Sequence, residues 1–189
     1  MTTPGDYPRE LECQVTLADQ RKLSIRPLRP DEEGPVRELD GRLSNRTRYL
    51  RFLSPLPALP DSLLRLLASV DYRRRLSLIA EVDTGGRREV IALGSFGGLD
   101  NGTAEVALVV SDAWQHQGIG TILARQVMRA AEDRGFAKFV VHVLWENTVI
   151  RRLLKRVGHI VSSRTSLGVA EVTFIRRIST ESEPAAAPL

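Results

Sequence analysis

The chain has very little cysteine, few aromatic residues and little histidine. It contains one cysteine, Cys13, and only 5% of its 189 residues are Phe, Trp or Tyr. A single cysteine excludes an internal disulfide and a cysteine-based zinc site. The three histidines, His116, His142 and His159, lie far apart without the spacing of metal ligands, so we expect no metal. Because aromatic residues are scarce and no basic stripe interleaves them, we expect no nucleic-acid partner.

Long apolar runs are also missing. No run approaches the roughly 20 residues that a membrane span requires, and the first residues lack the basic start and apolar core of a signal peptide. We therefore expect a cytoplasmic protein with no membrane partner. The length fits one domain of ordinary size. The net charge of +4 favours anionic partners only modestly, and it does not distinguish a phosphorylated cofactor from other anions.

Both ends of the chain differ in composition from the region between them. Residues 1–12 are polar and punctuated by proline and glycine, which predicts a flexible N-terminal tail. Residues 179–189 are low in complexity, which predicts a disordered C-terminal tail. A single domain is expected over residues 13–178.

The apolar patterns within residues 13–178 predict a mixed α/β fold with helices on the faces of a sheet. Helix signals include Asp61 and Asn147 at N-caps and Gly135 at a C-terminus. Helices are expected at residues 31–43, 46–53 (or a loop), from 61, 118–135 and 147–157. Strands are expected as a hairpin in 13–28 and at residues 76–82, 90–96, 104–110, 138–144, 160–165 and 171–178.

The stretch WQHQGIGTIL, residues 114–123, places two glycines between an apolar strand and an amphipathic helix. A helix N-terminus attracts phosphate, and glycine lets a ligand approach the backbone. Thr121 and Ile122 follow the second glycine, so this is not a P-loop, and Leu123 stands where a dinucleotide fingerprint requires a third glycine. Taken alone, the two glycines fit a tight turn without a ligand equally well.

The remaining pattern, QHQGIG after a strand and the turn SDAW, resembles the pyrophosphate-binding motif of the GNAT superfamily of acyl-CoA-dependent N-acyltransferases. The resemblance covers most of the chain, from about residue 14 to residue 178. It is greatest to the bacterial Pat-type protein lysine acetyltransferases, through LSIRPLRPDE, RYLRFL, AEVALVV and WENTVIRRLLKRVG. It implies a GNAT fold, with a mixed, mostly antiparallel sheet of six to seven strands. A V-shaped splay is expected between the strands that end at Val110 and Leu144.

The resemblance further implies that acetyl-CoA is the co-substrate, with its pantetheine arm in the splay and its pyrophosphate on the glycine loop. Asn147 fits either a hydrogen bond to the pantetheine arm or the substrate, or a plain helix cap. Trp114 is expected to pack beneath the loop. Basic residues at 151, 152, 155 and 156 either approach the phosphates or form a solvated face. The expected cofactor-binding residues are Leu108, Val109, Val110, Gln115, His116, Gln117, Gly118, Ile119, Gly120, Thr121, Asn147 and Arg151.

Acyl transfer to a lysine amine requires a base, because the amine has a pKa of about 10.4 and arrives protonated. Glu105 is the candidate, since it lies in an otherwise apolar strand and matches the proposed general base of the Pat-type AEV segment. The alternatives are that Glu105 is a strand-edge residue facing water and that Glu146 serves as the base. Backbone N–H groups near residues 108–110 are expected to stabilise the oxyanion.

The tyrosine that acts as general acid in many GNAT enzymes is replaced by Leu154. The leading hypothesis is an N-acetyltransferase acting on a protein lysine, such as one in an acyl-CoA synthetase, by direct attack in a ternary complex. The alternatives are a small-amine acceptor and a non-catalytic acyl-CoA-binding regulatory module. Arg46, Arg48 and Arg51 either line the acceptor groove or face solvent. A monomer and a homodimer are both compatible with the sequence.

Overall fold

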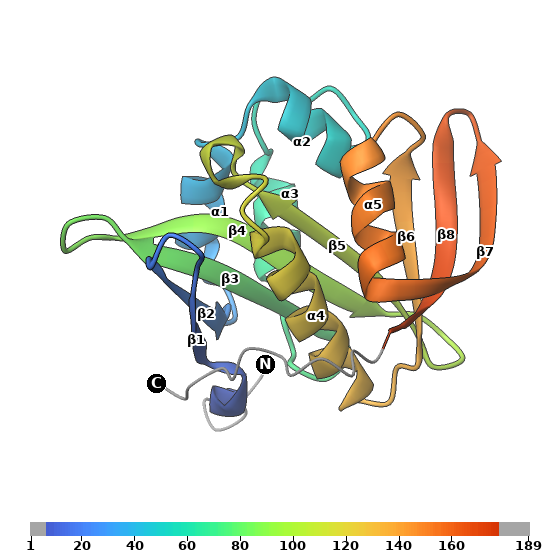
Figure 1. Ribbon diagram of the computed structural model, residues 1–189, viewed down its shortest axis with the longest axis horizontal. Coiled ribbons are helices and arrows are strands. Elements are labelled where there is room, and N and C mark those ends of the chain that lie inside the picture. The colour runs from blue at the N-terminus through green and yellow to red at the C-terminus, as the bar shows by residue number, and fades with distance from the viewer. Residues whose placement is uncertain (1–6, 178–189) are drawn as a thin grey trace.

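The computed structural model describes residues 7–177, which form one mixed sheet with helices on both faces (Figure 1). The strands are β1 (Cys13–Thr16), β2 (Lys22–Pro27), β3 (Arg75–Asp83), β4 (Arg88–Gly98), β5 (Thr103–Val110), β6 (Lys138–Leu144), β7 (Gly158–Ser166) and β8 (Val169–Arg176). The helices are α1 (Glu33–Asp40), α2 (Asn45–Phe52), α3 (Asp61–Ala68), α4 (Ile119–Glu132) and α5 (Thr148–Val157), with short 3-10 turns η2 (Arg9–Leu11) and η3 (Asp112–Trp114).

The strand order within the described chain is β1-β2-β3-β4-β5-β6-β8-β7, and only β5 and β6 pair in parallel. The expected α/β fold with a mostly antiparallel sheet is therefore confirmed. The sheet has eight strands over residues 7–177, rather than six to seven. The larger number arises because a hairpin at each edge is fully paired, β1 with β2 and β7 with β8.

The predicted splay is present and is set by strand register. β5 pairs with β6 only from Thr103 to Glu105, opposite residues 138–140. Beyond Glu105, β5 stays paired with β4 as far as Val110, whereas β6 stays paired with β8 as far as Leu144. Each strand therefore follows its outer neighbour, and the two strands diverge toward their carboxyl ends.

Two apolar layers hold the sheet from opposite faces. On one face, α4 packs on β4 so closely that a Cβ added at Gly94 would lie 2.9 Å from both Leu123 and Val127. On the other face, α1 and α3 enclose a separate cluster that includes Val109 of β5. The side chains of β5 alternate between these two faces. Val109 therefore faces the α1 and α3 side, and its neighbours at 108 and 110 face α4.

The start of the described chain is packed rather than extended into solvent. Tyr7 makes an edge-to-face contact with Tyr72 at 5.8 Å, and its hydroxyl donates to the Pro27 carbonyl at 3.3 Å. Residues 7–12 thus differ from the flexible tail expected at 1–12, because an aromatic anchor outweighs their polar composition. The remainder of that segment, residues 1–6, and the expected C-terminal tail at 179–189 lie outside the described residues.

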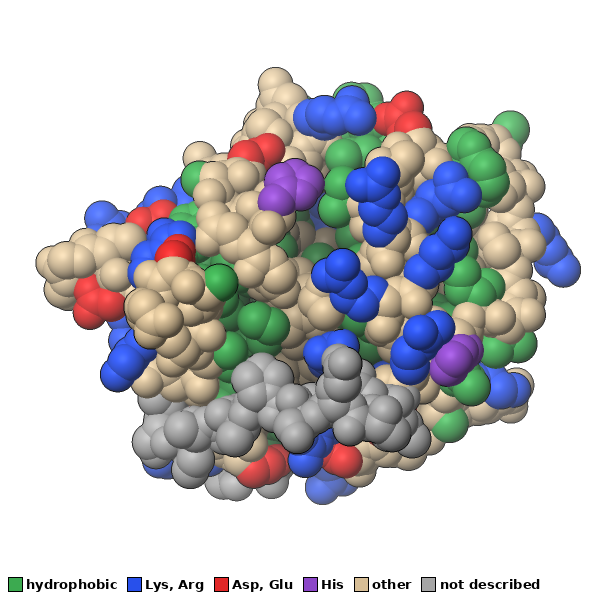
Figure 2. Space-filling view, in the orientation of Figure 1, with side chains coloured by type: hydrophobic (Ala, Val, Ile, Leu, Met, Phe, Trp, Pro, Cys, Tyr) green, Lys and Arg blue, Asp and Glu red, His purple; other side chains and the backbone are tan. Residues whose placement is uncertain are grey.

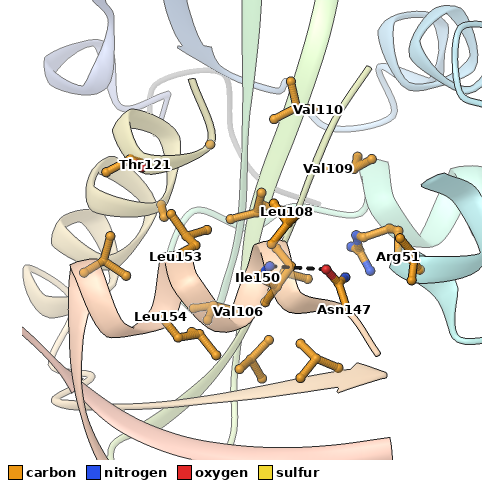
Figure 3. Close-up of a pocket in the computed structure, with 18 of the residues that line it drawn as sticks. Arg51, Val106, Leu108, Val109, Val110, Thr121, Asn147, Ile150, Leu153 and Leu154 are labelled. Atoms are coloured by element: carbon orange, nitrogen blue, oxygen red, sulfur yellow. Dashed lines mark hydrogen bonds between the residues drawn. The ribbon is translucent and has the colours of Figure 1, made fainter. Parts of the chain in front are cut away.

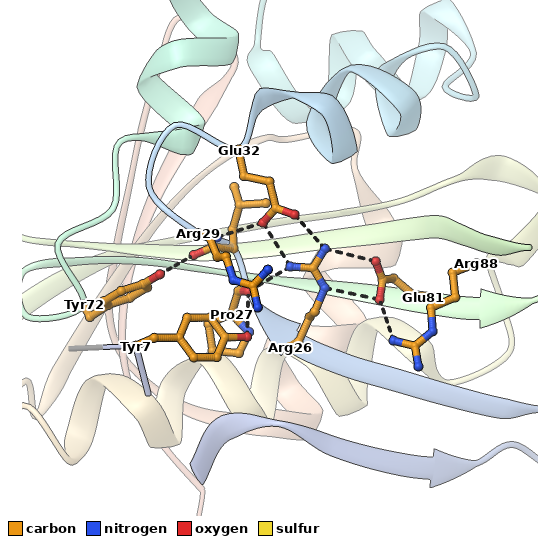
Figure 4. A network of polar contacts seen from close by, with 9 residues as sticks. Tyr7, Arg26, Pro27, Arg29, Glu32, Tyr72, Glu81 and Arg88 are labelled. Carbon is orange, nitrogen blue, oxygen red and sulfur yellow. Dashed lines mark hydrogen bonds and ion pairs between the residues drawn. The ribbon is translucent and has the colours of Figure 1, made fainter. Parts of the chain in front are cut away.

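An arginine-centred network joins the sheet to the start of α1 (Figure 4). Arg26 of β2 bridges Glu32, at 2.9 Å, and Glu81 of β3, at 3.2 Å. Burial acts to raise the pKa of Glu32, but the hydrogen bond from Arg26 and its charge outweigh burial and hold that pKa below its ordinary value. This contact fixes the chain where it leaves β2 for α1.

A buried ion pair holds α2 in place. Arg48 and Asp40 are 5% and 8% exposed, and the Arg48 Nε donates to an Asp40 carboxylate oxygen at 2.7 Å. The Arg48 guanidinium also donates to the Asp40 carbonyl, and the other Asp40 oxygen accepts from the Leu59 amide at 3.0 Å. Because every strong donor and acceptor is used, the pair links α1, α2 and the segment that leads to α3.

We expect Arg48→Met to lower the free energy of unfolding by about 3–5 kcal/mol, because it leaves Asp40 buried without its counter-charge. Arg46→Met is the matched control on the same helix, since Arg46 is exposed, and its effect should stay within about 0.5 kcal/mol. Urea unfolding of both variants measures this. Equal stability of the two variants would contradict the structural role of the pair.

Candidate active site

A cavity of about 620 Å³ fills the splay between β5 and β6. Figure 3 shows Leu108 and Val110 of β5, Thr121 of α4 and Leu153 of α5 around it, with Arg51 of α2 on the far side. Its volume falls within the roughly 300–1,000 Å³ of small-molecule pockets. The cavity is therefore large enough for the arm of an extended cofactor and a reacting group.

The β5 wall of the cavity presents free backbone groups. After Glu105, β5 has a hydrogen-bonded neighbour only on its β4 side. Every second residue therefore turns its N–H and C=O toward the gap, apart from the Val110 carbonyl, which accepts from the Gln115 side-chain amide at 3.0 Å. A ligand with amide groups, such as a pantetheine arm, can complete this open edge as a strand would.

The N-terminus of α4 points into the same cavity. Its cap residue, Gly118, has φ +82°, a left-handed conformation that favours glycine, and supplies no capping side chain. Within the described chain, the amides of Ile119 and Gly120 have no hydrogen-bond acceptor. Unpaired amides at the positive end of a 14-residue helix fit a phosphate group.

The glycine loop is fixed to α2 through one carboxylate. Asp112 accepts hydrogen bonds from the Ser44 amide at 2.8 Å, the Ser44 hydroxyl at 2.7 Å and the Thr47 hydroxyl at 2.7 Å. Burial acts to raise the pKa of Asp112, but these bonds outweigh it and hold that pKa below its ordinary value. Asp112 is therefore ionised at neutral pH, and it joins the two walls of the cavity.

Glu105 lies at the point where β5 and β6 separate, and its side chain lines the cavity while remaining 49% exposed. The His142 Nδ1 lies 3.1 Å from one Glu105 carboxylate oxygen, and the His142 Nε2 lies 3.3 Å from Glu171. Three adjacent strands, β5, β6 and β8, thus contribute to one polar chain. Sequence reasoning missed His142 and Glu171, although a histidine inside an apolar strand was a visible signal.

Most residues predicted to bind the cofactor line this cavity, and three do not. The side chain of Ile119 is 1% exposed and lies in the core, because it belongs to the apolar face of α4, so only its unpaired amide is available to the cofactor. Gln117 faces outward, where it accepts from Arg21 and donates to the Ala113 carbonyl. Arg151 lies over the Trp145 ring at 4.1 Å. The predicted residues that line the cavity are Glu105, Leu108, Val109, Val110, Gln115, His116, Gly118, Gly120, Thr121 and Asn147.

Four further predictions concern single residues near the cavity. Asn147 caps α5 by accepting from the Ile150 amide at 3.2 Å, so the capping interpretation is correct, and a cofactor contact remains a prediction. Trp114 is buried beneath the loop, as expected. Leu154 is buried and lines the cavity at the position of the family tyrosine. Glu146 is exposed and lies outside the cavity lining, which weakens it as an alternative base.

Basic side chains gather over α5 beside the hollow at the cavity mouth (Figure 2). Arg152, Lys155 and Arg156 are exposed on this helix, and Arg152 and Arg156 also line the cavity. Their position favours an anionic ligand. Residues 7–177 contain no cluster of three or more potential metal ligands, and no helix in that range is long and apolar enough to cross a membrane.

Residues 46–159 match the model of the GNAT acetyltransferase family. The chain belongs to this family. It is 35% identical over 147 residues to the acetyltransferase Pat of Mycolicibacterium smegmatis, a match that covers 75% of this chain but only 43% of Pat. The expected class of enzyme, an acetyl-CoA-dependent N-acetyltransferase, is thereby confirmed.

Solved structures agree on the fold of this GNAT enzyme. The GNAT domain of PAT from S. lividans superposes with a TM-score of 0.78 at 26% identity, over 90% of this chain and 99% of that domain. The structure of yncA from Salmonella typhimurium, solved with acetyl-CoA, has a TM-score of 0.61 at 16% identity. It covers 87% of this chain and 99% of that one, and at this identity it supports the fold alone.

Substitution of the two loop glycines, Gly118 and Gly120, should have different effects on stability and on acetyl-CoA binding. A Cβ at Gly120 would lie 3.7 Å from Leu108 and 3.8 Å from Val110, an ordinary contact in the protein without ligand. Since alanine also favours a helix over glycine by about 1 kcal/mol, we expect Gly120→Ala to unfold at an equal or higher temperature. Its Cβ would nevertheless occupy space beside the phosphate site, so acetyl-CoA should bind at least about tenfold more weakly, a loss of about 1.4 kcal/mol.

Gly118→Ala is the control, because its left-handed φ should cost about 1–2 kcal/mol of stability whatever is bound. Thermal unfolding and calorimetric titration with acetyl-CoA measure both variants. Unchanged affinity in Gly120→Ala would rule out the glycine loop as the phosphate site.

Proposed function

We propose that this GNAT enzyme transfers the acetyl group of acetyl-CoA to a lysine side chain of a protein, with Glu105 as the general base. The observation that carries the proposal is the position of Glu105. It is the last residue of β5 paired with β6, and its carboxylate lines the cavity in which the strands separate. The similarity to Pat supports a protein lysine as acceptor, although the chain spans less than half of Pat's length.

The first requirement of the reaction is to deprotonate the incoming amine. Glu105 has a carboxylate at the cavity wall, and the half-exposed position keeps it accessible to an acceptor from solvent. The adjacent His142 limits the rotation of this carboxylate by holding one of its oxygens. The other Glu105 oxygen has no hydrogen-bond partner among the described residues and can accept the amine proton directly or through water.

The second step forms the C–N bond and breaks the C–S bond of the thioester. Negative charge develops on the carbonyl oxygen, and the free N–H groups of β5 beyond Glu105 are placed to stabilise it. Leu154 cannot donate a proton to the departing thiolate. The thiol of coenzyme A is acidic enough to leave without a strong general acid, so the leucine is compatible with turnover.

A second candidate is a regulatory module that binds acyl-CoA without turning it over. Leu154 at the tyrosine position is the observation that favours it. A small amine is a further candidate acceptor, because the cavity would admit one. Thiol release with purified acyl-CoA synthetase, with polyamines and with no acceptor separates these possibilities.

We expect Glu105→Gln to lower thiol release by about 100-fold, because general-base catalysis typically contributes about 10²–10⁴-fold. The matched control is Glu146→Gln, which changes an exposed carboxylate outside the cavity lining and should leave the rate unchanged. Calorimetry should show the same affinity for acetyl-CoA in both variants. A native rate of thiol release in Glu105→Gln would show that Glu105 is not the base. An equal loss of rate in the two variants would show that the effect is nonspecific.

A further inference from the structure

The acceptor side of the cavity contains a cation with incomplete hydrogen bonding, Arg51, which interacts electrostatically with the Glu105 carboxylate but forms no ion pair with it. Arg51 lies in the last turn of α2, and its side chain reaches the cavity wall beside Val109 (Figure 3). The Arg51 Nε is buried and has no hydrogen-bond partner within residues 7–177. The guanidinium lies 4.8 Å from the Phe52 ring and makes no ion pair with any described residue. One turn earlier on the same helix, each nitrogen of the Arg48 guanidinium donates a hydrogen bond, so the two arginines of α2 differ in this respect.

An unpaired cation in this position is costly to the fold. Burial lowers the pKa of Arg51 to about 10, against the opposing effect of the Glu105 carboxylate, and the side chain remains charged at neutral pH. A buried charge is ordinarily paired or hydrogen-bonded. Because no described residue hydrogen-bonds the Arg51 Nε, and one oxygen of Glu105 is engaged by His142, an anionic group of a ligand is the natural complement.

We propose that Arg51 binds a carboxylate group carried by one of the two substrates. The planar guanidinium can donate two parallel hydrogen bonds to a carboxylate, whereas a neutral substrate leaves it unpaired. Leu50, Phe52 and Val109 line the adjoining wall, so this recognition would occur in apolar surroundings. The inference rests on the proposed function, because that function determines from which side each substrate enters the cavity.

The cofactor's phosphates are not the expected ligand of Arg51. Gly120 lies near Leu108 and Val110, on the α4 face of β5. Val109, next to Arg51, belongs to the cluster on the opposite face. Two sources of a carboxylate can reach that face, the far end of a dicarboxylic acyl chain and an acidic side chain beside the acceptor lysine.

The acyl arm of the test is a binding measurement that needs no turnover. Calorimetry compares succinyl-CoA with butyryl-CoA, a neutral four-carbon analogue, on native protein, Arg51→Gln and the control Arg46→Gln. If the acyl chain is the source, native protein and the control should prefer succinyl-CoA by at least about tenfold, and Arg51→Gln should lose the preference. Failure of both thioesters to bind would instead refute the proposed function.

The acceptor arm uses acetyl-CoA and peptides in which the residue next to a lysine is either Glu or Gln. If the acceptor is the source, native protein should release thiol at least about tenfold faster with the Glu peptide, and Arg51→Gln should equalise the two. The proposal is overturned if native protein shows no carboxylate preference in either arm, or if the preference survives in Arg51→Gln.

Thermal unfolding supplies an independent readout for the variant. Since Arg51→Gln removes a half-buried charge whose Nε has no hydrogen bond within residues 7–177, it should unfold at the same temperature as native protein or a few degrees higher. Arg51→Lys provides a second test, because it keeps the charge but loses the planar fork. It should retain stability while losing most of the carboxylate preference. A carboxylate preference equal to native in Arg51→Lys would overturn recognition by the guanidinium fork.

Discussion

The site depends on one feature of the sheet, the short parallel pairing of β5 with β6. Three residue pairs hold the strands together, and after Glu105 each strand follows its outer antiparallel neighbour. This divergence opens the cavity, frees the backbone edge of β5 and places Glu105 at its inner end. A sheet paired along its full length would have neither the space nor the free N–H groups.

The polar groups around the gap between β5 and β6 are of two kinds, those with a full set of hydrogen-bond partners and those without. Arg48 with Asp40, and Asp112 with Ser44 and Thr47, have complete sets of partners and fix α2 against the rest of the fold. Among the described residues, the first amides of α4 lack hydrogen-bond partners, as does the Nε of Arg51. Unsatisfied groups reduce stability, so those that line the cavity indicate where a ligand can complete the structure.

The order of elements and the position of the glycine loop could be predicted from the sequence, because both depend on local patterns and on a family motif. Whether a side chain of the loop faces the cavity or the core was harder to predict from the motif alone. Ile119 was predicted to bind the cofactor from its place in the loop; its helical spacing with Leu123 and Val127 directs its side chain into the core and leaves only its amide for such a contact. The chain from Glu105 through His142 to Glu171 could not be predicted, because it depends on the register between three strands.

A crystal structure of the protein with a non-hydrolysable analogue of acetyl-CoA would show directly whether the gap between β5 and β6 is the active site. We expect the pantetheine arm between β5 and β6 beyond Glu105, with the pyrophosphate on the amides of residues 118–121. The acyl carbon should lie within reach of an amine that contacts Glu105. An analogue bound outside the splay, or with its thioester remote from Glu105, would show that the active site lies elsewhere.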